Sequence, residues 1–247
     1  NIATPKHFVV APTAALRDTL AAAGITAFYH EGLGKFTEKP SKAYGDETFT
    51  KMMMLKQFSV HLALMCGYDV LFQDVDLTWL KDPMPVLQQN AKHYHVQFMD
   101  DGARNFLNAP YFANSGFFFI RGADMDTLKY WDHVTMSMFG DANQRVVEKI
   151  MHLHVQRNGL RTKTLRPKEW TSGMHLGARD KPAKVAKRLV ESTVLHFCWT
   201  VNISAKFTKM NTHKAVFLRE PDCFFMIDKC DLSAGEAWRD TVCTVPA

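Results

Sequence analysis

Apolar and polar positions alternate in blocks along the first third of the chain, and the blocks predict strands and helices in turn. The apolar run at residues 7–11 predicts a short strand that Pro12 ends, and residues 26–29 predict a second strand. Between these strands, Thr13 is placed to cap a helix and Gly24 to stop it.

A longer helix is predicted at residues 48–66, because apolar side chains recur there at helical spacing. These side chains are Leu55, Phe58, Leu62 and Met65. A loop with three glycines precedes this helix at residues 30–46, and residues 69–73 predict the next strand. The order strand, helix, strand, loop, helix, strand is typical of α/β proteins, in which helices flank a mainly parallel sheet.

The later chain gives a mixed and less regular pattern. Strands are predicted at residues 95–99, 116–121 and 194–197, and helices at residues 126–139 and 143–154. Neither an internal repeat nor a low-complexity linker separates these segments. We therefore interpret residues 1–247 as one α/β domain with a mixed, mainly parallel sheet.

The composition suits one large globular domain, with 247 residues of which 47% are hydrophobic and 22% charged. No stretch approaches the ~20 apolar residues that a membrane span needs. Zinc-knuckle spacings and the aromatic signatures of RNA-binding sheets are absent, so we expect no nucleic-acid partner. The sequence begins at Asn1 and not at methionine, so we expect a processed or truncated chain in which a missing anchor is uninformative.

Positive charge gathers between residues 157 and 188. Ten lysines and arginines lie there against Glu169 and Asp180, in a chain of net charge +5. This run predicts either a solvated basic face or a surface that attracts an anionic substrate or a membrane.

The five cysteines form no CxxC pair. Cys66 and Cys198 stand among apolar residues and are interpreted as small core residues. Cys223, Cys230 and Cys243 cluster near the C-terminus, which suggests one disulfide, one thiol left over and an oxidising compartment.

The segment GYDVLFQDVDLTWLKDP, residues 67–83, places two acids directly after an apolar strand. At the C-terminal end of a strand in an α/β sheet, where ligands bind, Asp74 and Asp76 can both reach one cation. Mg²⁺ and Mn²⁺ prefer carboxylate oxygens and share their shell with substrate phosphates. The structural alternative is that Asp74 caps a turn while Asp76 forms a surface ion pair with Lys81.

Haloacid-dehalogenase phosphatases are one enzyme class with such a strand, and Asp74, Asp76 and Thr78 match their DxDxT motif. Asp74 would then be a nucleophile that forms an aspartyl-phosphate. Their later acidic motif is incomplete here, because no second acid follows Gly140-Asp141 within residues 142–145. That first motif also normally opens the domain, whereas a strand-helix-strand-helix unit precedes it here.

The second class is the metal-dependent nucleotide-sugar glycosyltransferases of the GT-A fold. The segment at residues 67–83, followed by YFANSGFFFIRG (111–122), ANQRVVEKI (142–150) and VLHFCWTVNISAK (194–206), resembles glycosyltransferase family 77 in order and spacing. That family groups nucleotide-diphospho-sugar transferases, including plant arabinosyl-, xylosyl- and galactosyltransferases. The resemblance covers about residues 49–210. It implies a GT-A-type, Rossmann-like fold, with residues 1–122 mainly binding the nucleotide sugar and residues 123–247 mainly on the acceptor side.

The resemblance implies a metal site at three residues. Asp76 is expected to bind Mn²⁺ or Mg²⁺ directly, and Asp74 to bind the metal or the ribose. His196, in HFCW, is similar to the late histidine that completes the metal shell; its structural alternative is a core histidine.

The resemblance also implies a donor site. Lys206 is expected to contact the diphosphate, or else to be a plain surface lysine. Asn114 and Ser115 are expected near the donor sugar, or else as a polar cap on the strand. Asp100-Asp101-Gly102 lies near the presumed sugar site, with a turn as its alternative. The further positions that we assign to donor binding are Ala11, Thr13, Lys56, Asp101 and Gly173.

One departure from the family concerns the catalytic helix. The family often has Asp-Gln at its start, where this chain has Asn143-Gln144. Gln144 is expected to face the anomeric carbon, Asn143 offers only hydrogen bonds, and Asp141 is a substitute carboxylate. We expect a retaining hexosyl- or pentosyltransferase that uses a UDP-sugar and a carbohydrate or glycoprotein acceptor in the Golgi or the secretory-pathway lumen. A donor-binding protein without turnover is the remaining alternative.

Overall fold

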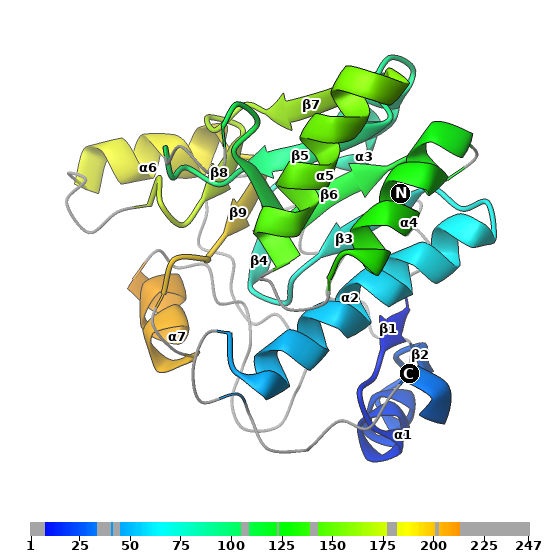
Figure 1. Cartoon of the computed structure of the whole chain (residues 1–247). Helices are drawn as coiled ribbons and strands as arrows, with labels where there is room; N and C mark the ends of the chain where they lie inside the picture. Colours follow the sequence, from blue (N-terminus) through cyan, green and yellow to red (C-terminus); the bar gives the residue numbers. More distant parts are fainter. Residues whose placement is uncertain are drawn as a thin grey trace.

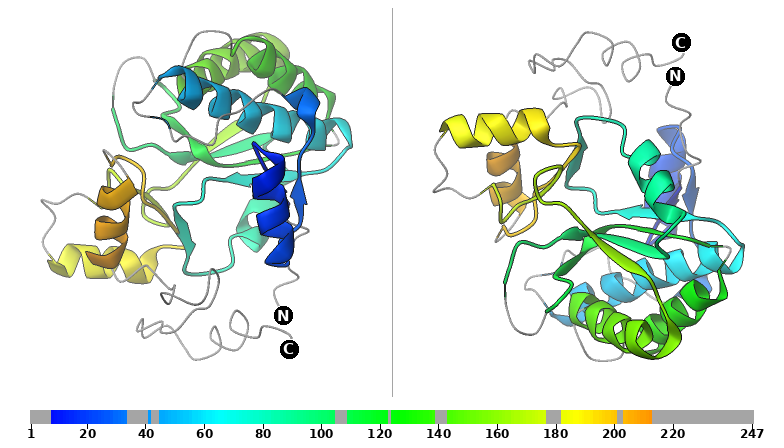
Figure 2. Two further views of the ribbon diagram at one scale, coloured as in Figure 1. Left: turned by 90° about the horizontal axis from the view of Figure 1, so that it is seen from below. Right: turned by 90° about the horizontal axis from the view of Figure 1, so that it is seen from above.

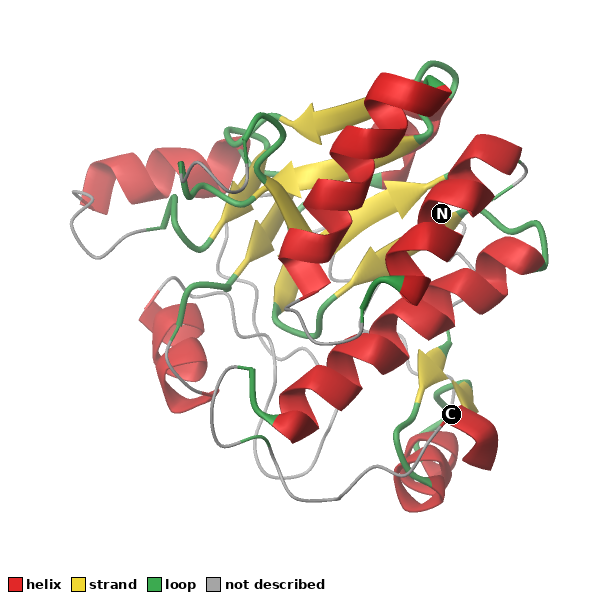
Figure 3. Ribbon diagram, viewed as in Figure 1, coloured by secondary structure: helices red, strands yellow, loops and turns green. Residues whose placement is uncertain are grey.

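The computed structural model describes residues 8–33, 41, 45–104, 109–122, 124–138, 143–176, 182–200 and 203–212, in which strands and helices alternate along much of the chain (Figures 1 and 3). The strands are β1 (Val9–Val10), β2 (Ala27–Phe28), β3 (Val70–Gln73), β4 (Leu77–Trp79), β5 (Val96–Asp100), β6 (Ala113–Ile120), β7 (Thr162–Leu165), β8 (Trp170–Ser172) and β9 (Val194–His196). The helices are α1 (Ala14–Ala22), the 3-10 turn η1 (Glu31–Leu33), α2 (Glu47–Met65), α3 (Met84–Ala91), α4 (Met125–Met136), α5 (Asn143–Asn158), α6 (Pro182–Glu191) and α7 (Ile203–Thr212).

The strands divide among three sheets. A four-stranded sheet has the order β3-β6-β5-β7, a three-stranded sheet has the order β4-β9-β8, and β1 pairs with β2 alone. The α/β fold with helices flanking mixed sheets, which the sequence predicted, is confirmed.

The prediction that the sheet is mainly parallel is wrong for the four-stranded sheet. There β6 runs antiparallel to both β3 and β5, and the one parallel pairing described in this sheet is that of β5 with β7. The physical reason is that no crossover helix lies in the described residues 101–104 and 109–112 between β5 and β6, so β6 returns antiparallel beside β5. The predicted strand-helix-strand unit does form a parallel pair at β1 and β2.

Strand β6 is buried on both faces and holds the two main layers together. Phe118 and Ile120 face the layer of α2, α4 and α5, where Phe118 packs 4.9 Å from Trp131 between ring centroids. Phe117 and Phe119 face the opposite side, in a core that includes Leu87 of α3. Figure 2 shows α2, α4 and α5 together on one side of the sheet and α3 on the other. A continuous run of apolar residues suits a strand that is covered on both faces.

Helix α2 forms where predicted, but its buried face matches the predicted apolar positions only in part. Leu55 is buried, whereas Phe58, Leu62 and Met65 are exposed and Val60 and Leu64 lie in the core. Apolar residues occur on both faces of this helix, so periodicity alone does not choose between them. A hydrogen bond from another helix also fixes α2: the backbone carbonyl of Gln57 accepts the indole N–H of Trp131 in α4.

Several smaller expectations also change. Cys66 is exposed at the end of α2 and is not a core residue, while Cys198 is half-buried. Thr13 accepts the Leu16 N–H as the N-cap of α1, as predicted. The C-terminal cysteines lie outside the described residues. In the part of the chain that the structure describes, no helix combines the length and apolar content needed to cross a membrane.

The described part of the basic run contributes to packing between elements. Arg161 approaches His95 to 2.9 Å, Lys163 donates to Asn90 Oδ1 at 2.7 Å, and Lys168 pairs with Glu191 at 3.2 Å. These three basic side chains therefore already have polar partners within the protein, and their positions can be explained without an anionic ligand.

Glu148 on α5 is a buried acid with only 4% of its surface exposed. Burial raises its pKa to about 8; the nearby Ala113 backbone opposes the shift and the Asp101 carboxylate adds to it. The folded state therefore holds this proton more tightly than the unfolded chain does. The resulting stabilisation is complete below the unfolded pKa of 4.5 and is lost as the pH rises towards 8.

We predict that Glu148→Gln raises the melting temperature relative to the original protein by roughly 5 °C or more at pH 8, and by much less at pH 5. Calorimetry at the two pH values measures the difference. Glu31→Gln, at an exposed position, is the control and leaves the pH dependence unchanged. An equal shift at both pH values would show that Glu148 does not titrate in this way.

Candidate active site

The segment Asp74-Val75-Asp76 is where the chain passes from one sheet to the other. The N–H of Asp74, which follows β3, donates to the carbonyl of Gly116 in β6 at 2.7 Å. The carbonyl of Asp76, which precedes β4, accepts the N–H of Phe197, which follows β9, at 2.9 Å. Val75 between them is fully exposed. The two carboxylates are therefore fixed by backbone bonds to two different sheets.

His196 reaches the same point from a distant part of the sequence. In the antiparallel pairing of β4 with β9, His196 lies opposite Leu77. Its Nε2 is 3.4 Å from Asp76 Oδ1 and 3.9 Å from Asp74 Oδ2, and the histidine is 1% exposed. Ligand atoms of Asp74, Asp76 and His196 all lie within 4.8 Å of one another. The structure thus brings together the three residues that the sequence predicted as metal ligands.

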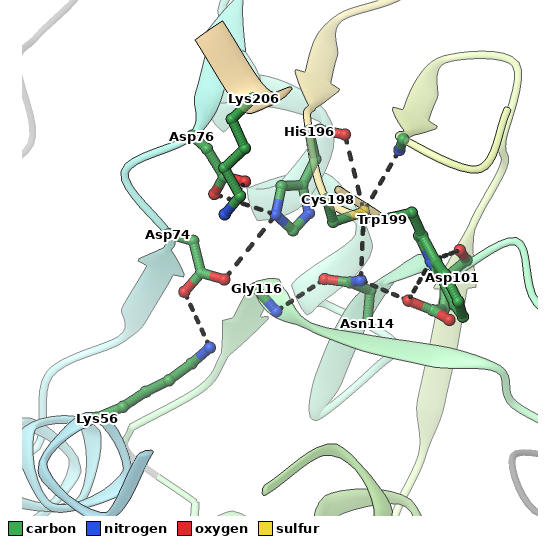
Figure 4. Close-up of polar contacts among 11 residues, drawn as sticks. Lys56, Asp74, Asp76, Asp101, Asn114, Gly116, His196, Cys198, Trp199 and Lys206 are labelled. Carbon is green, nitrogen blue, oxygen red and sulfur yellow. Dashed lines mark hydrogen bonds and ion pairs between the residues drawn. The ribbon is translucent and has the colours of Figure 1, made fainter. Parts of the chain in front are cut away.

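Two lysines neutralise the carboxylates (Figure 4). Lys56 of α2 is 2.9 Å from Asp74 Oδ1, and Lys206 of α7 is 2.8 Å from Asp76 Oδ2. Lys56 is buried, whereas the Lys206 side chain is 37% exposed and has room to move. The alternative pairing of Asp76 with Lys81 is wrong, because Lys81 Nζ donates to the carbonyls of Val190 and Glu191.

The charges of Asp76 and His196 support each other. Burial raises the pKa of Asp76, but hydrogen bonds and charge from His196 and Lys206 outweigh it and hold that pKa well below its usual value. Burial lowers the pKa of His196, but Cys198 and Asp76 outweigh it and raise that pKa to about 10. In the absence of a divalent ion, Asp76 is thus ionised and already has positive partners.

Gly116 provides the space that this cluster needs. A Cβ added to Gly116 would collide with the His196 ring and with Asp74 Oδ2, and would lie 2.9 Å from Asn114 Oδ1. The cluster combines two carboxylates and one imidazole, a donor set that Mn²⁺ accepts readily. The residues present therefore fit a divalent cation.

A polar network continues from this cluster into the protein. Asn114 Oδ1 accepts the Gly116 N–H at 2.8 Å, and Asn114 Nδ2 donates to Asp101 Oδ1 at 2.6 Å. Asp101 is 2% exposed, and its Oδ2 has no hydrogen-bond partner among the described residues. Asp100, by contrast, accepts a hydrogen bond from the Gly102 N–H, as in the predicted turn. Its two carboxylate oxygens also accept hydrogen bonds from the two Nη groups of Arg104. The acid pair thus divides into one structural carboxylate and one with an unused oxygen.

The other predicted site residues are placed less directly. Gly173 lies beside Cys198, whose Sγ accepts its N–H at 3.3 Å, and Ser115 is buried in β6. Ala11 is buried, and its N–H donates to the Phe28 carbonyl in the small parallel sheet. These contacts leave the donor-binding assignments as predictions.

The predicted catalytic residues belong to α5 or the turn before it. Asn143 and Gln144 form the first turn of α5, and Gln144 is half-buried. Asp141 lies outside the described residues. The roles assigned to these three residues also stay predictions.

Two residues at the site were not predicted from the sequence. Cys198 Sγ accepts the Gly173 N–H and lies 3.8 Å from Asn114 Nδ2, and Trp199 donates its indole N–H to Asp101. Cys198 and Trp199 come two and three residues after His196, so their closeness to His196 in the sequence was the available signal.

A second group of possible ligands, His95, Asp124 and Asp126, is also present. Arginines already occupy it, since Arg121 donates to Asp124 Oδ2 at 3.0 Å and Arg161 Nη2 lies 2.9 Å from His95 Nε2. This group is therefore an ion-pair network.

Comparison with known proteins decides between the enzyme classes. A family model described as nucleotide-diphospho-sugar transferase matches residues 3–210. The chain belongs to this family. The resemblance drawn from the sequence is confirmed, and the phosphatase alternative is not supported. Nucleotide-diphospho-sugar transferases are glycosyltransferases, so membership identifies the reaction class but neither the sugar nor the acceptor.

Two individual proteins add detail. Beta-arabinofuranosyltransferase RAY1 of Arabidopsis thaliana is 32% identical over 92 residues, a region that covers 37% of this chain and 17% of that protein. A solved glycosyltransferase involved in the glycosylation of the major capsid of PBCV-1 aligns with a TM-score of 0.48 at 10% identity, covering 85% of this chain and 100% of that one. The chain thus matches only a small part of the length of its plant relative.

We predict that Gly116→Ala weakens Mn²⁺ binding at least tenfold, because the new methyl group displaces His196 and Asp74. Gly116 does not have a left-handed backbone, so alanine adds no conformational strain there. Electron paramagnetic resonance of free Mn²⁺ measures the affinity, and circular dichroism confirms folding.

Gly24→Ala is the matched control for this substitution. Gly24 has φ +75° and open space around its Cβ position, so alanine there strains the backbone without touching the cluster. It should lower stability and leave Mn²⁺ affinity unchanged. Unaltered Mn²⁺ affinity in Gly116→Ala would contradict the geometry proposed for the cluster.

Proposed function

We propose that this chain is a metal-dependent retaining glycosyltransferase that moves a sugar from a UDP-linked donor to a hydroxyl group of a carbohydrate or glycoprotein acceptor. The observation that carries the proposal is the meeting of Asp74, Asp76 and His196 at the junction of the two sheets, with Lys206 beside them. Family membership supplies the reaction class. The name of the plant relative makes an arabinofuranosyl donor a reasonable first choice among pentoses.

Asp74, Asp76 and His196 would hold Mn²⁺ or Mg²⁺. When bound, such an ion offsets the charge of the donor diphosphate as the bond to the anomeric carbon breaks. The protein supplies the fixed positions of these ligands, because backbone bonds tie Asp74 to β6 and Asp76 to β9.

The lysines have different tasks in this proposal. Lys56 is buried and keeps Asp74 oriented through a 2.9 Å contact. Lys206 is exposed enough to turn from Asp76 to a phosphate oxygen, where its charge stabilises the leaving diphosphate.

The donor sugar is placed along the polar network next to the cluster. Asp101 Oδ2 is buried without a partner among the described residues, and we propose that donor binding opens this position so that the oxygen accepts a hydrogen bond from a sugar hydroxyl. Asn114 orients Asp101 from one side. A buried acceptor that stays unsatisfied costs free energy, so a hydroxyl at this position discriminates among sugars.

Gln144 is proposed to face the anomeric carbon, a role implied by the family resemblance. An amide is a poor nucleophile, but its carbonyl dipole can stabilise an oxocarbenium-like transition state. The acceptor then attacks from the side that the diphosphate leaves, and a phosphate oxygen takes the acceptor proton. We also propose the secretory-pathway lumen as the site of action.

We predict that Asp76→Asn abolishes Mn²⁺-dependent release of UDP from UDP-sugars while the protein stays folded. The change removes the charge that binds the cation and preserves the shape of the side chain. Asp132→Asn, at an exposed carboxylate on α4, is the control with normal activity. Full turnover by Asp76→Asn, or by the original protein in excess chelator, would refute metal dependence.

We predict that Gln144→Ala reduces turnover at least tenfold without weakening donor binding, if the dipole contributes ~1.4 kcal/mol or more to the transition state. Gln156→Ala, on an exposed turn of the same helix, is the matched control. Proton NMR of the first product formed from an α-linked donor gives the stereochemistry. A β-linked product would contradict retention and direct attention to Asp101 or Asp141 as a general base.

Donor binding without any UDP release, across a panel of UDP-sugars and acceptors, would instead identify a nucleotide-sugar-binding protein. Asn143, where the family often has aspartate, is the observation that keeps this second function in view.

A further inference from the structure

Trp199 has an unusual conformation for a large aromatic residue. It follows β9 and His196, its φ is 59°, and 52% of its surface is exposed. A non-glycine residue in the left-handed region costs about 1–3 kcal/mol, and such residues gather at functional sites. The fold therefore accepts strain to present this ring to solvent.

The indole ring is fixed along one edge. Its Nε1 donates to the Asp101 carbonyl at 3.1 Å and lies 3.3 Å from Asp101 Oδ1. Asp101 is itself held by Asn114 and, through its carbonyl, by the Ser172 hydroxyl. Because these bonds use only the N–H edge, they orient the ring plane while half of its surface stays accessible.

The position of the ring relative to the metal cluster is set by the same network. Figure 4 shows Asp76 and His196 at one end, then Gly116 and Asn114, then Asp101 with Trp199 at the far end. If the diphosphate lies at the cluster and the donor sugar against Asn114 and Asp101, the next ring along this path belongs to the acceptor.

We propose that Trp199 is the platform on which a sugar ring of the acceptor stacks during transfer. This inference rests on the proposed function and names the substrate subsite within it. The C–H face of a sugar is apolar and packs against an aromatic ring, whose negative face attracts the C–H groups. Met174, which is 42% exposed, lies against Gly102, the residue after Asp101.

A pre-fixed ring suits this task. A side chain that is already ordered loses little entropy when it binds, so weak stacking contributes fully to affinity. Carbohydrate pockets also need polar groups that fix orientation, and Asp101 lies directly beside the ring.

The test compares Trp199→Leu with Trp199→Phe. Leucine removes the aromatic face, whereas phenylalanine keeps a face and removes the N–H. Each variant is assayed for UDP release with water as the acceptor, and for transfer to methyl glycosides of arabinofuranose, xylose and galactose. Saturation-transfer NMR of the same glycosides, with UDP and Mn²⁺ present, measures acceptor binding without turnover.

Stacking predicts that Trp199→Leu raises the acceptor KM at least tenfold and abolishes saturation transfer. Both variants lose the indole N–H that bonds to Asp101, so any change in UDP release in water is shared by leucine and phenylalanine. Trp199→Phe should keep the acceptor KM within about threefold. Trp79→Leu is the matched control. Trp79 lies on β4 and donates its indole N–H to Gln73 Oε1 at 2.7 Å, so loss of this ring should leave acceptor binding unchanged.

Three results would overturn the platform. One is an equal rise of the acceptor KM in the leucine and phenylalanine variants, which indicates that Trp199 only holds Asp101. The others are an unchanged acceptor KM in Trp199→Leu and the absence of saturation transfer to every glycoside in the original protein. Failure of the original protein to release UDP from any UDP-sugar is a different result, because it contradicts the proposed function itself.

Discussion

The passage of the chain between two sheets at Asp74-Val75-Asp76 is the constraint on which the site depends. A carboxylate pair spaced by one residue is common in proteins, and such acids usually lie exposed on flexible turns. Here one backbone bond fixes the first acid to β6 and another fixes the second to β9. His196 is brought to both because β9 pairs with the strand that follows the second acid. The arrangement of the three proposed ligands thus depends on sheet pairing, which holds both ends of the short loop between β3 and β4.

Charge balance explains how these acids tolerate their surroundings. Asp76 is 6% exposed, and a buried carboxylate is strongly unfavourable unless it is paired. Lys206 and His196 provide that pairing without a cation. A divalent ion would take over this task and release Lys206 for the diphosphate. Lys56 differs, because its side chain is 7% exposed and depends on Asp74 for a partner. Removing Asp74 would leave a buried lysine unpaired, which makes Asp76 the better position for functional tests.

The sequence predicted the parts of this site that local pattern carries. An apolar strand ending in two acids, a late histidine and a following lysine were each recognisable, and the structure places Asp76, His196 and Lys206 together. The buried face of α2 could not be predicted, because Phe58 and Val60 are equally suitable by pattern and the choice depends on packing with α4. The antiparallel pairing of β6 with β3 likewise joins segments that are far apart in the sequence.

Other features of the site are not visible in the sequence for a related reason. The need for glycine at position 116 follows from the distance to His196, a residue of another sheet. The orientation of Trp199 follows from its φ angle and its bonds to Asp101. Both are relations between segments far apart in sequence, and single-chain patterns report neither.

Binding of one metal ion by His196, the two aspartates and the donor diphosphate can be measured by pulsed electron paramagnetic resonance of the protein with Mn²⁺ and UDP. If these residues hold the ion as proposed, one directly bound imidazole gives nitrogen coupling, UDP gives phosphorus coupling, and His196→Ala loses the nitrogen coupling. Phosphorus coupling without any histidine nitrogen, or nitrogen coupling that survives in His196→Ala, would show that His196 does not bind the metal.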